Sequence, residues 1–208
     1  MTVIDEEYDD KTYRGIAAIS NDNKYRYAAR YGYTLVVFGN LDEERNIAWS
    51  KIRGVQALLG QGFDWVFVMD ADVVITNPAI RLEDLIDDVF DLIITTDENG
   101  FNAGNFFVRN GPETQEFFRR VWETTDFEAD LPAILESQEA IWRLLKWSNP
   151  PPLRTQIAAQ RRFNAYWMAG EGNWEPGDFL IHFAGMGGER ADLRLALMQE
   201  YAELVEWE

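Results

Sequence analysis

The sequence predicts a single α/β domain in which a mostly parallel central sheet is flanked by helices. The chain has 208 residues, of which 47% are hydrophobic, and this is the size and composition of one globular domain. Strand-like and helix-like segments alternate over most of its length, as they do around parallel sheets. Residues 63–69, FDWVFVM, are apolar at nearly every position, which is typical of a central strand covered on both faces.

The first part of the chain alternates between strand and helix patterns. The apolar runs at 13–20 and 34–38 predict two strands, and residues 21–33 between them predict a turn that leads into a helix. Residues 40–62 predict a second helix, because apolar residues recur there at steps of four, three and four until glycines end it. This apolar stripe consists of Ala48, Ile52, Val55 and Leu59.

The middle of the chain continues the alternation beyond the buried strand. Residues 82–90 predict a helix and residues 91–96 a strand. Residues 98–104, ENGFNAG, contain two glycines and predict a loop, and residues 105–110 predict the strand after it.

The last part of the chain is predicted to be helical on either side of one strand. Gly111-Pro112 opens a helix at 113–122, and a further helix at 133–147 must end before the prolines at 150–152. Residues 177–183, GDFLIHF, predict the last strand, which leads through a glycine-rich turn into a terminal helix. The apolar side of that helix is expected to consist of Leu193, Leu197, Tyr201 and Leu204.

The charge balance argues against two classes of partner. Nineteen Lys and Arg against 36 Asp and Glu give a net charge of −17, which repels nucleic acid and anionic membrane surfaces. The absence of Cys excludes disulfides and thiolate chemistry and fits a reducing compartment.

No segment has the roughly 20 apolar residues of a membrane-spanning helix. The first ten residues, MTVIDEEYDD, lack the pattern of a signal peptide. We therefore expect a cytoplasmic location for the chain as given, or the Golgi lumen if an N-terminal anchor has been removed.

Two carboxylates stand where the buried strand ends. Asp70 and Asp72 follow 63–69 directly, and ligands of open α/β sheets bind beyond the carboxyl ends of the strands. Two acids this close repel each other unless a cation lies between them, and oxygen ligands favour Mg2+ or Mn2+. Such a cation would also allow a protein of charge −17 to hold an anionic diphosphate. A solvated Asp-x-Asp turn is the structural alternative.

His182, the single histidine, ends the predicted strand at 177–183. A lone histidine is more often a hydrogen-bonded structural residue, but its place at a second strand end favours a metal ligand. Two Asp and one imidazole favour Mn2+ over Mg2+.

Further polar residues are candidates for ligand contacts. Asn102 lies in a loop whose glycines allow close approach of a ligand, and Asp97 precedes it. Lys51 lies on the helix that leads to the Asp70 strand, where it could meet a phosphate or pair with an acid. Gln138 is a polar residue beside an apolar helix face.

The ordered blocks AWSKI, DWVFVMDADVVITNP, TTDENGFNAGNFFVRN, ESQEAIWRLL, RFNAYW and GDFLIHFAG resemble a family of retaining α-glycosyltransferases. This family includes yeast α-1,2-galactosyltransferases, α-1,6-mannosyltransferase subunits and plant xyloglucan xylosyltransferases. The resemblance extends from about residue 45 to residue 188. It implies one GT-A domain over 1–208, with donor binding in about 1–110 and the acceptor side in about 111–208.

The resemblance also implies a cofactor, a donor and an acceptor. Mn2+, with Mg2+ as the second choice, would be held by Asp70, Asp72 and His182, and the donor would be a UDP-sugar. The acceptor would be a glycan or glycoconjugate. Residues expected at the nucleotide sugar are Ser20, Lys51, Asp70, Asp97, Asn102, Gln138 and Gly185.

Two positions depart from the family's pattern. Acids often precede the glutamine in the family, where this chain has Glu136-Ser137. A lysine often follows the histidine shortly, where this chain has Gly185-Met186-Gly187-Gly188 before Arg190.

The expected reaction is sugar transfer with retention at the anomeric carbon. Gln138 and Asp72 are the predicted catalytic residues, with Gln138 steadying the oxocarbenium-like sugar and Asp72 holding the cation that stabilises the leaving diphosphate. The acceptor would attack from the face that the phosphate leaves. A covalent intermediate on Glu136 or Glu139 is the minority mechanism.

The sequence is also compatible with other functions. A phosphatase of the haloacid-dehalogenase type, with Asp70 as nucleophile, would share the MDADVVI pattern. A nucleotidyltransferase is weaker, because its basic glycine-rich N-terminal loop is missing. The non-enzymatic alternative is a catalytically inactive domain that binds sugar nucleotides or glycans.

Overall fold

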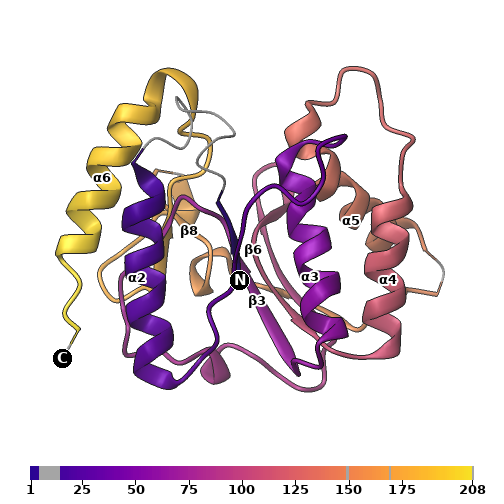
Figure 1. The fold of residues 1–208 in the computed structure, drawn as a ribbon, viewed down its shortest axis with the longest axis horizontal. Coiled ribbons are helices and arrows are strands. Elements are labelled where there is room, and N and C mark those ends of the chain that lie inside the picture. The colour runs from indigo at the N-terminus through magenta and orange to yellow at the C-terminus, as the bar shows by residue number, and fades with distance from the viewer. Residues whose placement is uncertain (5–14, 149, 169, 208) are drawn as a thin grey trace.

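The computed structural model describes residues 1–4, 15–148, 150–168 and 170–207 and contains a large sheet with a smaller sheet beside it (Figure 1). Over these residues the large sheet has the order β2-β1-β3-β6-β5-β7. Strands β2, β1 and β3 run in one direction, β6 runs against them, and β5 and β7 return to the first direction. The predicted mostly parallel sheet is thus confirmed. Its strands are β1 (Thr2–Val3), β2 (Val37–Phe38), β3 (Trp65–Met69), β5 (Leu92–Asp97), β6 (Gly100–Arg109) and β7 (Thr155–Ala158).

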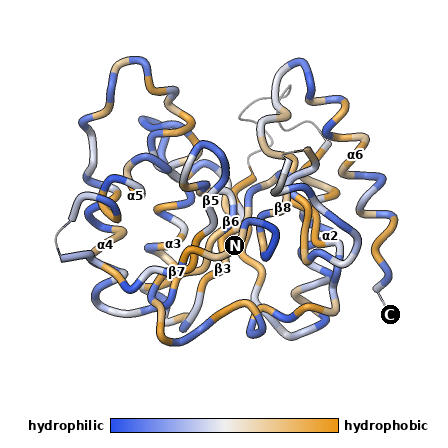
Figure 2. Tube along the Cα trace, turned by 180° about the vertical axis from the view of Figure 1, so that it is seen from behind, coloured by the Kyte–Doolittle hydropathy of each residue, from blue (hydrophilic) through white to orange (hydrophobic). Residues whose placement is uncertain are grey.

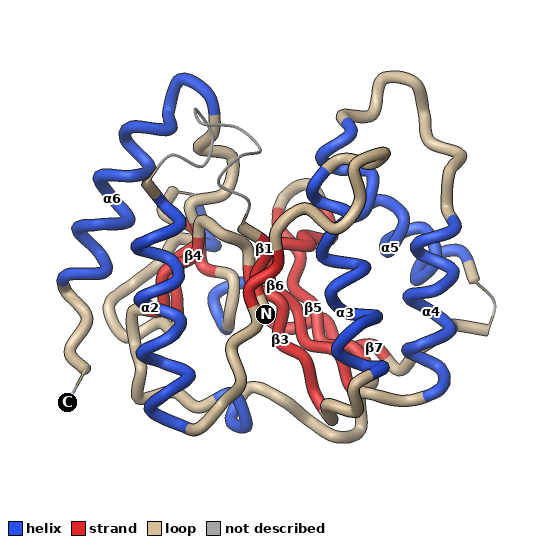
Figure 3. The backbone as a smooth tube through the Cα atoms, viewed as in Figure 1, coloured by secondary structure: helices blue, strands red, loops and turns tan. Residues whose placement is uncertain are grey.

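Three helices cover one face of the large sheet: α3 (Ser50–Gly60), α4 (Pro112–Glu123) and α5 (Glu136–Trp147) (Figure 3). Alternate residues of β3 enter two different cores, as the period of a strand requires. Val66 and Val68 pack toward these helices, whereas Phe67 and Met69 pack on the opposite side. Apolar segments accordingly gather along the strands in Figure 2. The prediction that 63–69 is covered on both faces is confirmed.

The smaller sheet is built from β4 (Val73–Ile75), β9 (Leu180–His182) and β8 (Ala165–Tyr166). Helices α2 (Ile16–Tyr31) and α6 (Ala191–Glu203) pack on it and on each other (Figure 1). Short 3-10 turns complete the described elements: Ile47–Trp49, Leu82–Asp84, Ala133–Leu135, Gln160–Arg162, Gly170–Gly172 and Gly188–Arg190. Within the described ranges, no helix is both long and apolar enough to cross a membrane.

The strand predicted at 13–20 is wrong over the residues that the structure describes. Ile16 to Ser20 form the start of α2, and the first strand is Thr2–Val3 instead. The buried positions of α2, among them Ile16, Ser20, Lys24 and Tyr27, recur at helical spacing. The short apolar run was therefore one turn of a buried helix face.

Three other boundaries also differ from the prediction. Of residues 82–90 only Leu82–Asp84 form a 3-10 turn, because Oδ1 of Asp87 accepts from the N–H of Val89 and the backbone carbonyl of Asp87 accepts from the N–H of Phe90. Residues 100–104 extend β6 and are not a loop. On the terminal helix α6, Leu197 and Tyr201 pack against the core as predicted, whereas Leu193 and the following Leu204 are exposed. The most buried positions of α6 are Arg194 and Met198.

Candidate functional site

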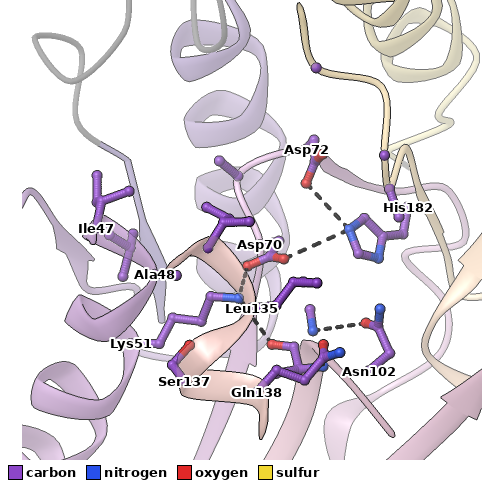
Figure 4. A pocket seen from close by; sticks show the side chains of 18 of the residues that line it. Ile47, Ala48, Lys51, Asp70, Asp72, Asn102, Leu135, Ser137, Gln138 and His182 are labelled. Atoms are coloured by element: carbon purple, nitrogen blue, oxygen red, sulfur yellow. Dashed lines mark hydrogen bonds and ion pairs between the residues drawn. The ribbon is translucent and has the colours of Figure 1, made fainter. Parts of the chain in front are cut away.

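A cavity of about 480 Å3 lies between the ends of β3 and β9 and the start of α5. Figure 4 shows Lys51, Asp70, Gln138 and His182 directed into a common space. Most of the predicted site residues line this cavity: Lys51, Asp70, Asp72, Asn102, Gln138, His182 and Gly185. Sequence segments separated by more than one hundred residues therefore meet here.

Asp70, Asp72 and His182 are brought together by the backbone of the small sheet. Asp70 follows β3, Asp72 precedes β4, and His182 ends β9, where it pairs with Val73 in antiparallel register. The N–H of Phe183 also donates to the backbone carbonyl of Asp72 over 2.9 Å. Nε2 of His182 consequently lies 3.3 Å from Asp72 and 3.8 Å from Asp70.

The orientation of His182 follows from a chain of hydrogen bonds that starts at a backbone N–H. Gly104 N–H donates to Oδ1 of Asn102, which identifies that atom as the oxygen. The same oxygen accepts from Nδ2 of Asn164 over 3.0 Å, so the oxygen of Asn164 faces Nδ1 of His182 at 2.8 Å. Nδ1 must therefore carry the proton, and Nε2 is the atom that faces the carboxylates.

Each carboxylate also has a cationic neighbour. Lys51 Nζ lies 2.5 Å from Asp70 and donates to the carbonyl of Ala103 over 3.1 Å. Arg194 Nη1 lies 3.4 Å from Asp72. Burial alone would raise the pKa of Asp72, but the contact with His182 at 3.3 Å and the charge of Arg194 outweigh it and lower that pKa to about 2. Asp72 is thus ionised at neutral pH.

Lys24 is a buried residue that binds the backbone of Asp70. Its buried Nζ donates to the backbone carbonyl of Asp70 over 2.6 Å and to the hydroxyls of Ser20 and Thr2. Burial lowers the pKa of Lys24 to about 7, although the charges of Asp70 and Asp72 act in the opposite direction. Lys24 therefore fixes the backbone at the end of β3.

Gln138 and Gly104 shape the other wall of the cavity. Oε1 of Gln138 accepts from the N–H of Ala103 over 2.8 Å, which places the amide oxygen. A Cβ on Gly104 would lie 2.3 Å from Cε1 of His182 and 2.8 Å from Oδ1 of Asn102. Gly104 thus allows β6 to pass directly under the imidazole ring.

Ser20 and Asp97 do not line the cavity. Ser20 lies in α2, wholly buried, where its hydroxyl accepts from Lys24. Asp97 accepts from the hydroxyl of Tyr166 over 2.7 Å and from Nδ2 of Asn102 over 3.4 Å. Both residues therefore contact groups that position the site, and their predicted contact with a nucleotide sugar stays a prediction.

Sequence reasoning assigned no role to two residues of this site. Asn164 lies within the RFNAYW block, and its place in that block was the only signal. Arg194 gave no signal, because a cationic residue in an amphipathic helix is usually exposed, whereas this side chain is only 4% exposed.

A sequence model of the galactosyl transferase GMA12/MNN10 family matches residues 1–89 and 85–192. The chain belongs to this glycosyltransferase family. The resemblance inferred from the six sequence blocks is therefore confirmed, over a longer stretch of chain than those blocks cover. The match also argues against the phosphatase interpretation, in which Asp70 would be a nucleophile.

Individual members of the GMA12/MNN10 family have low sequence identity to this chain. The probable alpha-1,2-galactosyltransferase gmh2 of Schizosaccharomyces pombe is 24% identical over 204 residues, covering 78% of this chain and 58% of that protein. The probable alpha-1,6-mannosyltransferase MNN10 of Saccharomyces cerevisiae is 24% identical over 200 residues, covering 73% of this chain and 48% of that protein. The chain spans about half the length of these relatives.

Solved glycosyltransferase structures share the fold. A glycosyltransferase involved in the glycosylation of the major capsid of PBCV-1 superposes with a TM-score of 0.73 at 16% identity, covering 96% of this chain and 98% of that one. The galactosyltransferase LgtC, solved with donor and acceptor sugar analogues, gives a TM-score of 0.51 at 13% identity, covering 98% and 95%. These similarities establish the GT-A fold predicted for the chain.

The residues of this member of the GMA12/MNN10 family fit a divalent cation. Asp70, Asp72 and His182 each offer one ligand atom, and these atoms lie within 4.8 Å of one another. Carboxylate oxygens and an imidazole nitrogen form a donor set that suits Mn2+. The bond from Nδ1 of His182 to Asn164 is the kind of outer contact that orients ligating histidines.

Proposed function

We propose that the chain is a cation-dependent retaining glycosyltransferase that moves a sugar from a UDP-sugar to a hydroxyl of a glycan or glycoconjugate. The carrying observation is the single cavity that contains Asp70, Asp72 and His182 together with Lys51 and Gln138. Family membership supports the reaction class. The names of the two curated relatives include galactosyl and mannosyl transfer, so they support a hexose without distinguishing between sugars.

Asp70, Asp72 and His182 would hold the cation, with Mn2+ preferred and Mg2+ second. A bound divalent cation would supply Lewis-acid stabilisation of the leaving diphosphate. The protein itself would hold the carboxylates of Asp70 and Asp72 and Nε2 of His182 in position before the donor binds. Lys51, at the wall of the cavity, supplies a positive charge for the phosphates.

Gln138 would stabilise the sugar as positive charge develops at the anomeric carbon. Its amide oxygen is placed by the N–H of Ala103, so it is oriented without the donor. An oxygen lone pair fixed in this way stabilises developing positive charge without reorganisation during the reaction. This role agrees with the expectation from the sequence and stays a proposal.

Two acids near Gln138 are bound to other residues, and this supports acceptor attack from the face that the phosphate leaves. Glu136 accepts from the indole N–H of Trp49 over 3.1 Å, and Glu139 pairs with Arg143 over 2.7 Å. Neither acid lines the cavity. The two carboxylates considered for a covalent intermediate are therefore engaged elsewhere, which favours a mechanism without a protein nucleophile.

The cavity draws on both parts of the chain distinguished in the sequence. Lys51, Asp70, Asp72 and Asn102 come from the proposed donor part, about 1–110, whereas Gln138 and His182 come from the proposed acceptor part, about 111–208. We propose that the acceptor hydroxyl reaches the sugar from the α5 side.

The test is UDP binding and transfer with and without Mn2+. We expect UDP to raise the unfolding temperature only in the presence of Mn2+, because a ligand of the folded state stabilises it. In Asp72→Asn this increase should be lost, while Asp130→Asn, an exposed acid, should behave as wild type. Transfer products analysed by NMR should keep the anomeric configuration of the donor.

Three results would contradict the proposal. UDP binding that does not depend on Mn2+ would remove the role of the acid pair. Binding without turnover over a panel of sugars and acceptors would indicate the inactive binding domain. An inverted anomeric centre would exclude the mechanism.

A further inference from the structure

Arg194 is a buried cation with unused hydrogen-bonding capacity beside the proposed donor site. It lies in the first turn of α6, its side chain is 4% exposed, and it lines the cavity. Within the described part of the chain, its Nε and Nη2 are buried and have no hydrogen-bond partner. Among the residues that the structure describes, the one partner of this guanidinium is Asp72, which lies 3.4 Å from Nη1. Buried guanidinium groups are normally satisfied, so the free donors indicate a ligand.

The charges of the site suggest which ligand this is. Asp70 and Asp72 are each paired with one cation, Lys51 and Arg194 respectively. A divalent cation bound by the two carboxylates would neutralise their negative charge. Lys51 and Arg194 would then need a new counter-charge, and a dianionic diphosphate supplies it. The cation and the diphosphate together leave the net charge of the site unchanged.

The cationic side chain that could bind the diphosphate on this side of the cavity comes from α6. The loop after β9 contributes Ala184, Gly185, Met186 and Gly187 to the cavity, and none of these side chains is charged. A guanidinium offers a planar fork of N–H groups that matches phosphate oxygens, and it stays charged when buried.

We propose that Arg194 binds the diphosphate of the nucleotide sugar, and that it shields Asp72 while no cation is bound. This inference rests on the proposed function. The inference predicts different effects of removing Arg194 on the affinities for the diphosphate and for the cation. Removing Arg194 weakens the diphosphate complex, but it relieves charge repulsion against the cation and so does not weaken cation binding.

The experiment measures Mn2+ and UDP separately. Mn2+ binding is followed by electron paramagnetic resonance without nucleotide, and UDP binding by calorimetry in saturating Mn2+. In Arg194→Met we expect UDP affinity to fall by about 10-fold or more, the usual effect of losing a charged hydrogen bond. Mn2+ affinity should stay equal or become tighter. Arg194→Lys, which keeps the charge but not the fork, should lose less UDP affinity.

Arg120→Met is the matched control. It removes the same charge from an exposed residue of α4 that does not line the cavity. We expect both affinities to match those of wild type. Arg194→Lys also keeps the test valid if Arg194→Met does not fold, because its UDP affinity must still fall relative to wild type.

The outcomes separate the inference from the function on which it rests. Unchanged UDP affinity in both Arg194 variants overturns the inference. An equal loss of Mn2+ and UDP affinity also overturns it, since Arg194 would then only hold Asp72 in place. If wild type binds no UDP in Mn2+, the proposed function fails and the inference falls with it.

Discussion

The side-chain oxygen of Asn164 lies 2.8 Å from Nδ1 of His182, while Nε2 of the same ring faces Asp72 at 3.3 Å. Asn164 is wholly buried and also donates to Thr95 and Asn102. One amide therefore sets the tautomer of the histidine and ties it to β5 and β6. This residue shapes the proposed metal site without touching the ion.

Asn164→Ala should weaken Mn2+ binding by about 10- to 100-fold, as is typical when the outer partner of a ligating histidine is lost. The free energy of unfolding should also fall by about 1–3 kcal/mol, because His182 and Asn105 lose a buried acceptor. Electron paramagnetic resonance of free Mn2+ and urea unfolding measure the two effects. Asn99→Ala, at an exposed position, is the control. Wild-type Mn2+ affinity in Asn164→Ala would contradict this role.

Gly104→Ala should displace His182. The added methyl would lie 2.3 Å from Cε1 of the ring, so the imidazole or β6 must shift. We expect about 10-fold or greater loss of Mn2+ affinity and about 1–3 kcal/mol of destabilisation from overpacking. Gly60→Ala is the matched control, since a Cβ there meets nothing within 4 Å. Equal Mn2+ affinity in the two variants would show that the ring tolerates the methyl group.

Lys24 should make the stability of the fold depend on pH. Its pKa is about 7 in the folded protein and about 10.4 in the unfolded chain, so the unfolded state binds more protons between these values. The free energy of unfolding contributed by this residue should therefore rise with pH from about 7 to about 10, by at most about 1.4 kcal/mol per pH unit.

Lys24→Met should lack this increase. Urea unfolding of both proteins across the same pH range gives the difference. Burial raises the pKa values of Tyr27 and Tyr166, so these two hydroxyls stay protonated in the folded protein over this range. Parallel stability curves for the two proteins would mean that Lys24 does not titrate between the two values.

Gln138→Ala should reduce kcat by about 100-fold or more while leaving UDP affinity in Mn2+ within about twofold of wild type. The reason is that the amide oxygen is proposed to act on charge that develops only in the transition state. Steady-state kinetics and calorimetry separate the two quantities, with exposed Gln115→Ala as control. A loss of UDP affinity with unchanged kcat would assign Gln138 to ground-state binding.

Much of the site was predictable because its residues follow buried strands. Asp70 and Asp72 stand at the end of an unmistakable apolar run, and His182 ends another, so strand ends alone indicated where they meet. Lys51 was found because the helix before β3 has a clear apolar stripe. The family resemblance supplied the roles that spacing could not.

The remaining features depend on contacts between distant segments. The sequence predicts a strand at Ser20 because a short apolar run has no clear period, whereas packing of α2 against β4 stabilises a helix there. Arg194 and Asn164 depend on contacts across 122 and 18 residues, which local patterns do not contain. The helix predicted at 82–90 failed because Asp87 competes for the backbone.

The ladder between β4 and β9 has a practical consequence for protein engineering. Asp72 and His182 owe their separation to paired backbone, through Val73 opposite His182 and the bond from Phe183 to Asp72. The opposite wall of the cavity comes instead from the start of α5, from the 3-10 turn before it and from the uncharged residues after β9. Randomised libraries directed at Leu135, Ser137 and Met186 should therefore change the shape of the cavity while the main chain keeps Asp72 and His182, two of the proposed cation ligands, in place.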